Sequence, residues 1–123
     1  MCRRGSDKFT QVLGGLNPVA GPYFDISAPE ATGVVAVLAP QRSSLLGLVS
    51  VVAPVIVSGN TAVVLTSEDR PLPAITLAEC LTTSDVPGGV VNLVTGRTGE
   101  MAPWLASHRD VNAIALTGAA GAE

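Results

Sequence analysis

The sequence predicts an α/β fold, a Rossmann-like parallel sheet that is incomplete and has the order β-α-β-α-β-α-β. Three observations predict it: short apolar runs alternate with longer segments of helical length, the runs lack a polar face, and the connections are short. Strands of a parallel sheet read this way because helices cover both of its faces. The 123 residues amount to a single domain.

The expected strands are short and rich in valine, leucine, isoleucine and alanine. They cover residues 33–38, 61–65, 90–94 and 111–116. Residues 1–23 lack this regularity and are punctuated by glycine and proline, so we expect an irregular N-terminal segment followed by the partial domain at residues 24–123.

The expected helices have start and stop signals of their own. They cover residues 45–57, 71–81 and 98–107. Ser43 or Ser44 can cap the first, and Gly59 can end it as a left-handed residue. Pro71 suits the first turn of the second. A further helix is expected to open at residues 117–121.

Composition excludes several classes of protein. Hydrophobic residues make up 47% of the chain and charged residues 14%, which is too apolar for a disordered segment and predicts a piece that lacks its covering partner. The net charge is −3 and aromatic residues are 3%, so neither a basic face nor a stacking platform for nucleic acid is expected.

No membrane, metal or disulfide partner is expected either. The uncharged stretch at residues 43–67 is broken by Pro54 and the turn at residues 58–60, which indicates a helix followed by a strand. The chain has one histidine and two cysteines, Cys2 and Cys80, too few for a metal cluster or a disulfide framework. We expect Cys80 to be a buried helix thiol and the protein to be cytoplasmic and reduced.

Candidate binding residues follow the expected strands. In an open parallel sheet, ligands bind outside the carboxyl ends of the strands. Gly96 and Gly118 lie there and either admit a phosphate close to the backbone or serve turns and packing. Glu68 either accepts hydrogen bonds from the ribose hydroxyls of an adenosine or acts as a carboxylate at the start of the next helix.

No catalytic residue is predicted. Ser107, His108 and Asp110 have the side chains of a triad but lie within four residues of one loop, whereas a triad converges from separate segments. Cys80 has no histidine or cation near it in the sequence to lower its pKa.

A set of motifs from residue 24 onward resembles the cofactor domain of the aldehyde dehydrogenase superfamily. The motifs, in chain order, are Pro29-x-x-x-Gly33-Val34-Val35, Pro40, Ala53-Pro54-x-x-x-Ser58-Gly59-Asn60-Thr61, Ser67-Glu68-x-x-Pro71-Leu72, Pro87-Gly88-Gly89-Val90-Val91-Asn92-x-Val94-Thr95-Gly96, Ser107-His108-x-Asp110-Val111 and Leu116-Thr117-Gly118. The resemblance implies an oxidoreductase that uses NAD or NADP, in which a cysteine attacks an aldehyde and hydride passes to the nicotinamide.

The resemblance also implies roles for individual residues. Glu68 matches the family's glutamate that contacts the adenosine ribose. Gly96 and Thr98 match the loop beside the adenine, and Gly118 matches the loop near the pyrophosphate. Residues 24–123 would then be part of an NAD(P)-binding domain, whose partner is the remainder of a dehydrogenase chain or a homologous subunit.

The sequence departs from the family pattern at several positions. Arg42 replaces the asparagine of the oxyanion hole, and Leu65 replaces a lysine that reaches the ribose. Ala119 and Ala120 replace a serine and a threonine, and neither the nucleophilic cysteine nor the general-base glutamate is present. Two interpretations stay open: an inactive fragment of an aldehyde-oxidising enzyme, or a degenerate, non-catalytic relative that acts as a scaffold or partner subunit.

Overall fold

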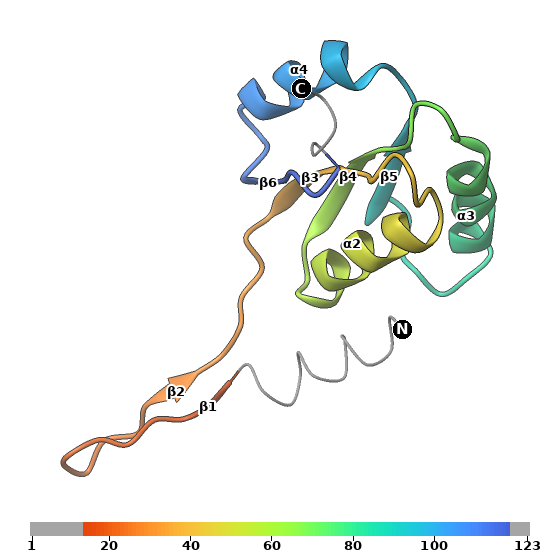
Figure 1. Ribbon diagram of the computed structural model, residues 1–123. Helices are drawn as coiled ribbons and strands as arrows, with labels where there is room; N and C mark the ends of the chain where they lie inside the picture. The colour runs from red at the N-terminus through yellow and green to blue at the C-terminus, as the bar shows by residue number, and fades with distance from the viewer. Residues whose placement is uncertain (1–13, 119–123) are drawn as a thin grey trace.

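The protein is an α/β structure with one four-stranded parallel sheet (Figure 1). The computed structural model describes residues 14–118. Across the sheet the strands are β5 (Val91–Val94), β4 (Thr61–Leu65), β3 (Val34–Leu38) and β6 (Ala113–Ala115). Helices α2 (Leu46–Val57), α3 (Leu72–Thr82) and α4 (Thr98–Ser107) connect them in turn. The predicted fold class is confirmed.

The strand order creates a switch in direction at β3. The chain moves from β3 to β4 and β5, then returns to place β6 on the free side of β3. Right-handed connections therefore put α2 and α3 on one face and α4 on the other (Figure 1). At such a point the connections leave neighbouring strands in opposite directions and open a crevice at their carboxyl ends.

Both faces of the central strands are buried, as the apolar runs indicated. Val35 and Val37 of β3 pack with α2, where Leu48 is fully buried. Ala36, on the opposite face of β3, is also fully buried. This two-sided burial explains why the strand has no polar side, and it places the core of the molecule at β3 and β4.

The ends of α2 follow from polar and glycine residues. The N-cap of α2 is Leu45, which makes no side-chain cap bond, so the predicted cap at Ser43 or Ser44 was wrong. The Oγ of Ser43, two residues before the N-cap, still accepts a hydrogen bond from the backbone N–H of Gly47 at 3.1 Å. Gly59 follows α2 with φ of 83°, in the left-handed region that glycine favours. The uncharged stretch at residues 43–67 is thus a helix and a strand. No helix within residues 14–118 is long and apolar enough to cross a membrane.

The N-terminal part of the described chain contains one short strand pair. β1 (Gly15–Leu16), within the segment 1–23 expected to be irregular, pairs antiparallel with β2 (Ile26–Ser27), which belongs to the segment 24–123. The side chain of Asn17 donates to the Oγ of Ser27 at 2.8 Å, and this local bond holds a pair too short to give a sequence pattern. Strands β1 and β2 and the residues between them form an arm, which projects away from the sheet (Figure 1).

The last strand is shorter than the expected 111–116. The N–H of Val111 bonds the carbonyl of His108 at 3.1 Å in a turn, and the side chain of Asn112 accepts a bond from the N–H of Val34 at 2.8 Å. Because of these contacts, the regular strand begins only at Ala113. The helix expected to open at residues 117–121 falls mostly on residues 119–121, which lie outside the described residues.

Candidate functional site

The four predicted binding residues all lie at the carboxyl edge of the sheet. Glu68 follows β4, Gly96 follows β5, Thr98 begins α4, and Gly118 follows β6. Because the strands are parallel, these positions share one edge although they are up to fifty residues apart in sequence.

Glu68 and Thr98 are in direct contact. The Oε2 atom of Glu68 accepts a hydrogen bond from the backbone N–H of Thr98 at 3.1 Å. The positive end of the α4 dipole and its free N–H groups favour a carboxylate there. The sequence had linked Glu68 to the start of the next helix, but α3 has no acidic residue in its first turn, and the carboxylate serves α4 instead.

Sequence reasoning missed a second residue at this edge, Gln41. Its Oε1 atom accepts a bond from the N–H of Glu68 at 2.8 Å, and its Nε2 atom donates to the carbonyl of Ala39 at 3.2 Å. The hydroxyl of Ser67 donates to the Gln41 carbonyl at 3.0 Å. The signal that could have found it is its place beside Arg42, in the loop after β3 that departs from the family pattern.

Gly118 lies against the end of β3, at the switch in strand order. Its N–H bonds the carbonyl of Leu38 at 2.9 Å. A Cβ at this position would meet backbone atoms of Leu38 and Ala39. Glycine is therefore required for the close approach of two backbones, which is the packing role left open by the sequence.

Gly96 also has a packing role. A Cβ there would meet the Sδ atom of Met101, on the first turns of α4. By contrast, nothing lies within 4 Å of a Cβ built on Gly99. The turn after β5 thus packs on its own helix at Gly96 and is open to solvent at Gly99.

Two buried hydroxyls at this edge have no partner. Among the described residues, the Oγ1 atoms of Thr66 and Thr98 are the buried side-chain oxygens or nitrogens without a hydrogen bond. Thr66 is completely buried at the end of β4, and Thr98 is half-buried. A polar group of a ligand or a water molecule at Thr98 would satisfy its hydroxyl.

The cations near this edge are not buried within it. Arg42 is exposed, and Arg97 forms an exposed ion pair with Glu100 at 3.1 Å. Leu65, at the position where the family has a lysine, is buried in the sheet. Within residues 14–118, the edge therefore holds an anionic side chain at Glu68 and no buried cation of the kind that a pyrophosphate favours.

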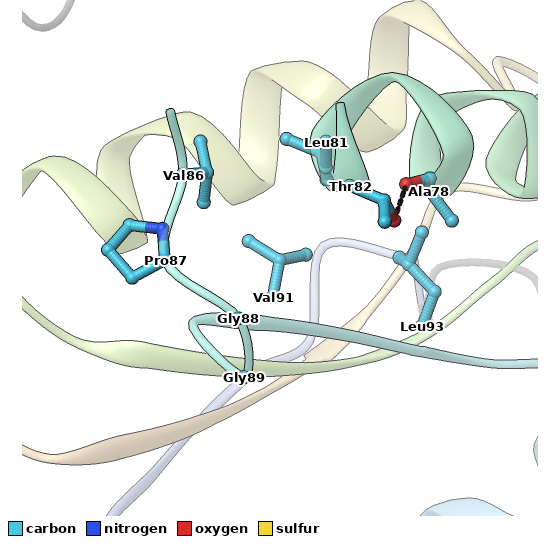
Figure 2. Close-up of a pocket in the computed structure, with 9 residues that line it drawn as sticks. All are labelled: Ala78, Leu81, Thr82, Val86, Pro87, Gly88, Gly89, Val91 and Leu93. Atoms are coloured by element: carbon cyan, nitrogen blue, oxygen red, sulfur yellow. Dashed lines mark hydrogen bonds between the residues drawn. The ribbon is translucent and has the colours of Figure 1, made fainter. Parts of the chain in front are cut away.

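A hollow of about 250 Å³ lies at the other end of the sheet (Figure 2). The end of α3, the turn at residues 87–89 and the start of β5 enclose it. Val91 and Leu93 project into it from β5, and Ala78 and Leu81 face them from α3. Thr82 adds a hydroxyl to the lining, and no lining residue carries a titratable group, so the hollow offers no charged side chain to a nucleotide.

The remaining sequence candidates stay local or exposed. The hydroxyl of Ser107 donates to the carbonyl of Pro103 at 2.9 Å, and the Nδ1 atom of His108 accepts from the N–H of Asp110 at 3.3 Å. These are bonds within one helix end and its loop, as expected. Cys80, expected to be buried, is exposed, because α3 buries only Ala74 and turns Cys80 away from the sheet.

Comparison with known proteins identifies the family. The model of the aldehyde dehydrogenase family matches residues 7–122. The chain belongs to the aldehyde dehydrogenase family. It is 35% identical to 2-hydroxymuconic semialdehyde dehydrogenase of Pseudomonas sp. strain CF600, over 94% of this chain and 26% of that protein. It is 32% identical to human aldehyde dehydrogenase 1A1, over 95% of this chain and 23% of that protein.

Solved structures of the family share the fold. The crystal structure of PnpE from Pseudomonas sp. WBC-3 superimposes with a TM-score of 0.82 at 31% identity, over 92% of this chain and 23% of that one. The NAD+ complex of the Bacillus cereus aldehyde dehydrogenase gives 0.82 at 25% identity, over 91% and 23%. The chain thus spans about a quarter of the length of its curated relatives. Relatives in this family are structurally characterised with NAD+ and with NADP.

Proposed function

We propose that the carboxyl edge of this sheet binds the adenosine end of NAD or NADP, as part of an aldehyde dehydrogenase-like oxidoreductase. The complete protein would oxidise an aldehyde to an acid, with the cofactor as hydride acceptor. The observation that carries the proposal is the Glu68–Thr98 hydrogen bond, which holds a carboxylate at the start of α4, one strand from the switch point.

The residues at this edge fit the adenosine end. A carboxylate has several lone pairs, so Glu68 can accept a bond from a ribose hydroxyl while it keeps the bond from Thr98. The unpartnered hydroxyl of Thr98 adds a polar contact beside it, at the positive end of the α4 dipole. Gly118 keeps the neighbouring backbones close at the switch point, where nucleotides bind in this architecture.

The residues fit the pyrophosphate and nicotinamide ends poorly. Leu65 supplies no cation, and Arg42 cannot reproduce the planar amide of the asparagine that it replaces. Each missing charge-assisted contact is worth roughly 1.5–3 kcal/mol. We therefore expect the chain alone to bind NAD weakly and to oxidise no aldehyde.

The same departures favour a second candidate, a degenerate relative that serves as a scaffold or partner subunit. In either case the partner is the remainder of the dehydrogenase chain or a homologous subunit, rather than a nucleic acid or a membrane. A cytoplasmic location belongs to the proposal, since the exposed thiol of Cys80 suits a reducing compartment. Named relatives are both cytosolic and mitochondrial.

The test is calorimetric titration of the chain with NAD, with NADP and with adenosine monophosphate. We expect dissociation constants weaker than micromolar and a further loss of roughly tenfold in Glu68→Ala. Asp69→Ala is the matched control, because it removes the same charge from the neighbouring exposed residue. Absence of binding at millimolar nucleotide, or an equal loss in the control, would overturn the proposal. NADH production from any aldehyde would overturn the expected inactivity.

A further inference from the structure

Gln41 joins two loops at the candidate site. It is half-buried and lies after β3, and both the nitrogen and the oxygen of its side-chain amide form hydrogen bonds. The Nε2 atom is held by the carbonyl of Ala39 in its own loop, and the Oε1 atom holds the N–H of Glu68 after β4. The hydroxyl of Ser67 ties the Gln41 backbone to the same neighbouring loop.

These bonds form a continuous path to α4. Gln41 fixes the backbone of Glu68 at 2.8 Å, and the carboxylate of that residue reaches the N–H of Thr98 at 3.1 Å. Glu68 is exposed, so no packing of its side chain against the sheet holds it in this position. The amide of Gln41 and the bond to Thr98 restrain Glu68 itself, while the hydroxyl of the buried Ser67 holds the preceding residue to the Gln41 carbonyl.

We propose that Gln41 is a positioning residue, which orients the Glu68 carboxylate toward the start of α4 and thereby toward the adenosine ribose. The effect on nucleotide binding rests on the proposed function, whereas the effect on the Glu68–Thr98 bond does not. The role requires a donor and an acceptor on one side chain, and an isosteric apolar side chain supplies neither.

The first experiment measures the unliganded chain. The exchange rate of the Thr98 amide proton is compared by NMR in the wild type and in Gln41→Met, which keeps the length of the side chain. We expect exchange to accelerate roughly three- to tenfold, because the acceptor on Glu68 becomes mobile. Thr76→Ala is the control, since it removes a side-chain bond elsewhere in the fold, to the Leu72 carbonyl on α3. An unchanged Thr98 rate in Gln41→Met would overturn the role of Gln41.

The second experiment is a double-mutant cycle on NAD affinity. Gln41→Met is expected to weaken binding roughly three- to tenfold in the wild type and to have no effect in the Glu68→Ala background. Equal loss in both backgrounds would show that Gln41 acts by another route and would contradict the proposal. Thermal unfolding of each variant confirms that it is folded.

The two failures are distinguishable. If the wild type binds no nucleotide, the proposed function fails, and the Thr98 exchange rate still decides the role of Gln41. If nucleotide binds but the Thr98 rate does not respond, the proposed function stands and the role of Gln41 is wrong.

Discussion

At the residue scale, the most informative pair is Thr66 and Ser67, adjacent buried residues with opposite hydrogen bonding. The hydroxyl of Thr66 has no partner, whereas that of Ser67 donates to Gln41 and accepts from the N–H of Arg70. We predict that Thr66→Val stabilises the chain by about 1 kcal/mol, since the swap keeps the shape and removes an unpaired polar group. Ser67→Ala should destabilise it by about 1–2 kcal/mol. Denaturant unfolding measures the change in the free energy of unfolding for each variant. Destabilisation by Thr66→Val would contradict the absence of a partner for the Thr66 hydroxyl.

Gly33 gives a second prediction at this scale. It precedes β3 with φ of 124°, its N–H bonds the side chain of Asn60 at 2.9 Å, and a Cβ would meet the Oδ1 of Asn112. We expect Gly33→Ala to cost about 2–3 kcal/mol through backbone strain and this clash. Gly88→Ala is the control, because Gly88 has open space around it. Equal unfolding midpoints for the two variants would count against the strain.

The residues of the candidate site show how much of it the sequence could predict. Glu68, Gly96 and Gly118 were predicted from strand ends, and Thr98 from the resemblance to the aldehyde dehydrogenase superfamily. The structure places all four at one edge of the parallel sheet, and their role in binding stays a prediction. Gln41 was missed because its role depends on the geometry between two loops, for which neither periodicity nor spacing gives a signal. The burial of Cys80 was predicted wrongly, because a helix pattern does not say how much of α3 the edge of the sheet covers.

At the element scale, the sheet and its helices were predictable and the arm was not. Two-sided apolar runs define β3 to β6 within a few residues. The pairing of β1 with β2 rests on two residues per strand and local bonds of Asn17 and cannot be recognised from periodicity.

The arm also supports a prediction. Leu16 and Ile26 are 69% and 56% exposed, so within the chain they contribute little burial. We predict that the pair Leu16→Ala and Ile26→Ala changes the free energy of unfolding by less than about 0.5 kcal/mol in denaturant titration. A loss of several kcal/mol would mean that the arm packs on the domain.

At the scale of the whole molecule, apolar surface remains uncovered. Tyr23 and Phe24 on the arm and Trp104 on α4 are each at least 75% exposed, and charged residues are 14% of the chain. Exposed apolar groups in a chain of low charge favour association. We predict species larger than a monomer in sedimentation velocity, increasing with concentration. A single monomeric species over the whole range would contradict this prediction.

Amide chemical shifts recorded during a titration with NAD test whether the adenosine end of NAD(P) binds at the carboxyl edge of the sheet. We predict that the largest changes occur at Glu68, Thr98 and Gly118, which follow the ends of three parallel strands. Changes confined to the hollow around Ala78 and Leu93 at the opposite end, or no change at millimolar NAD, would contradict it.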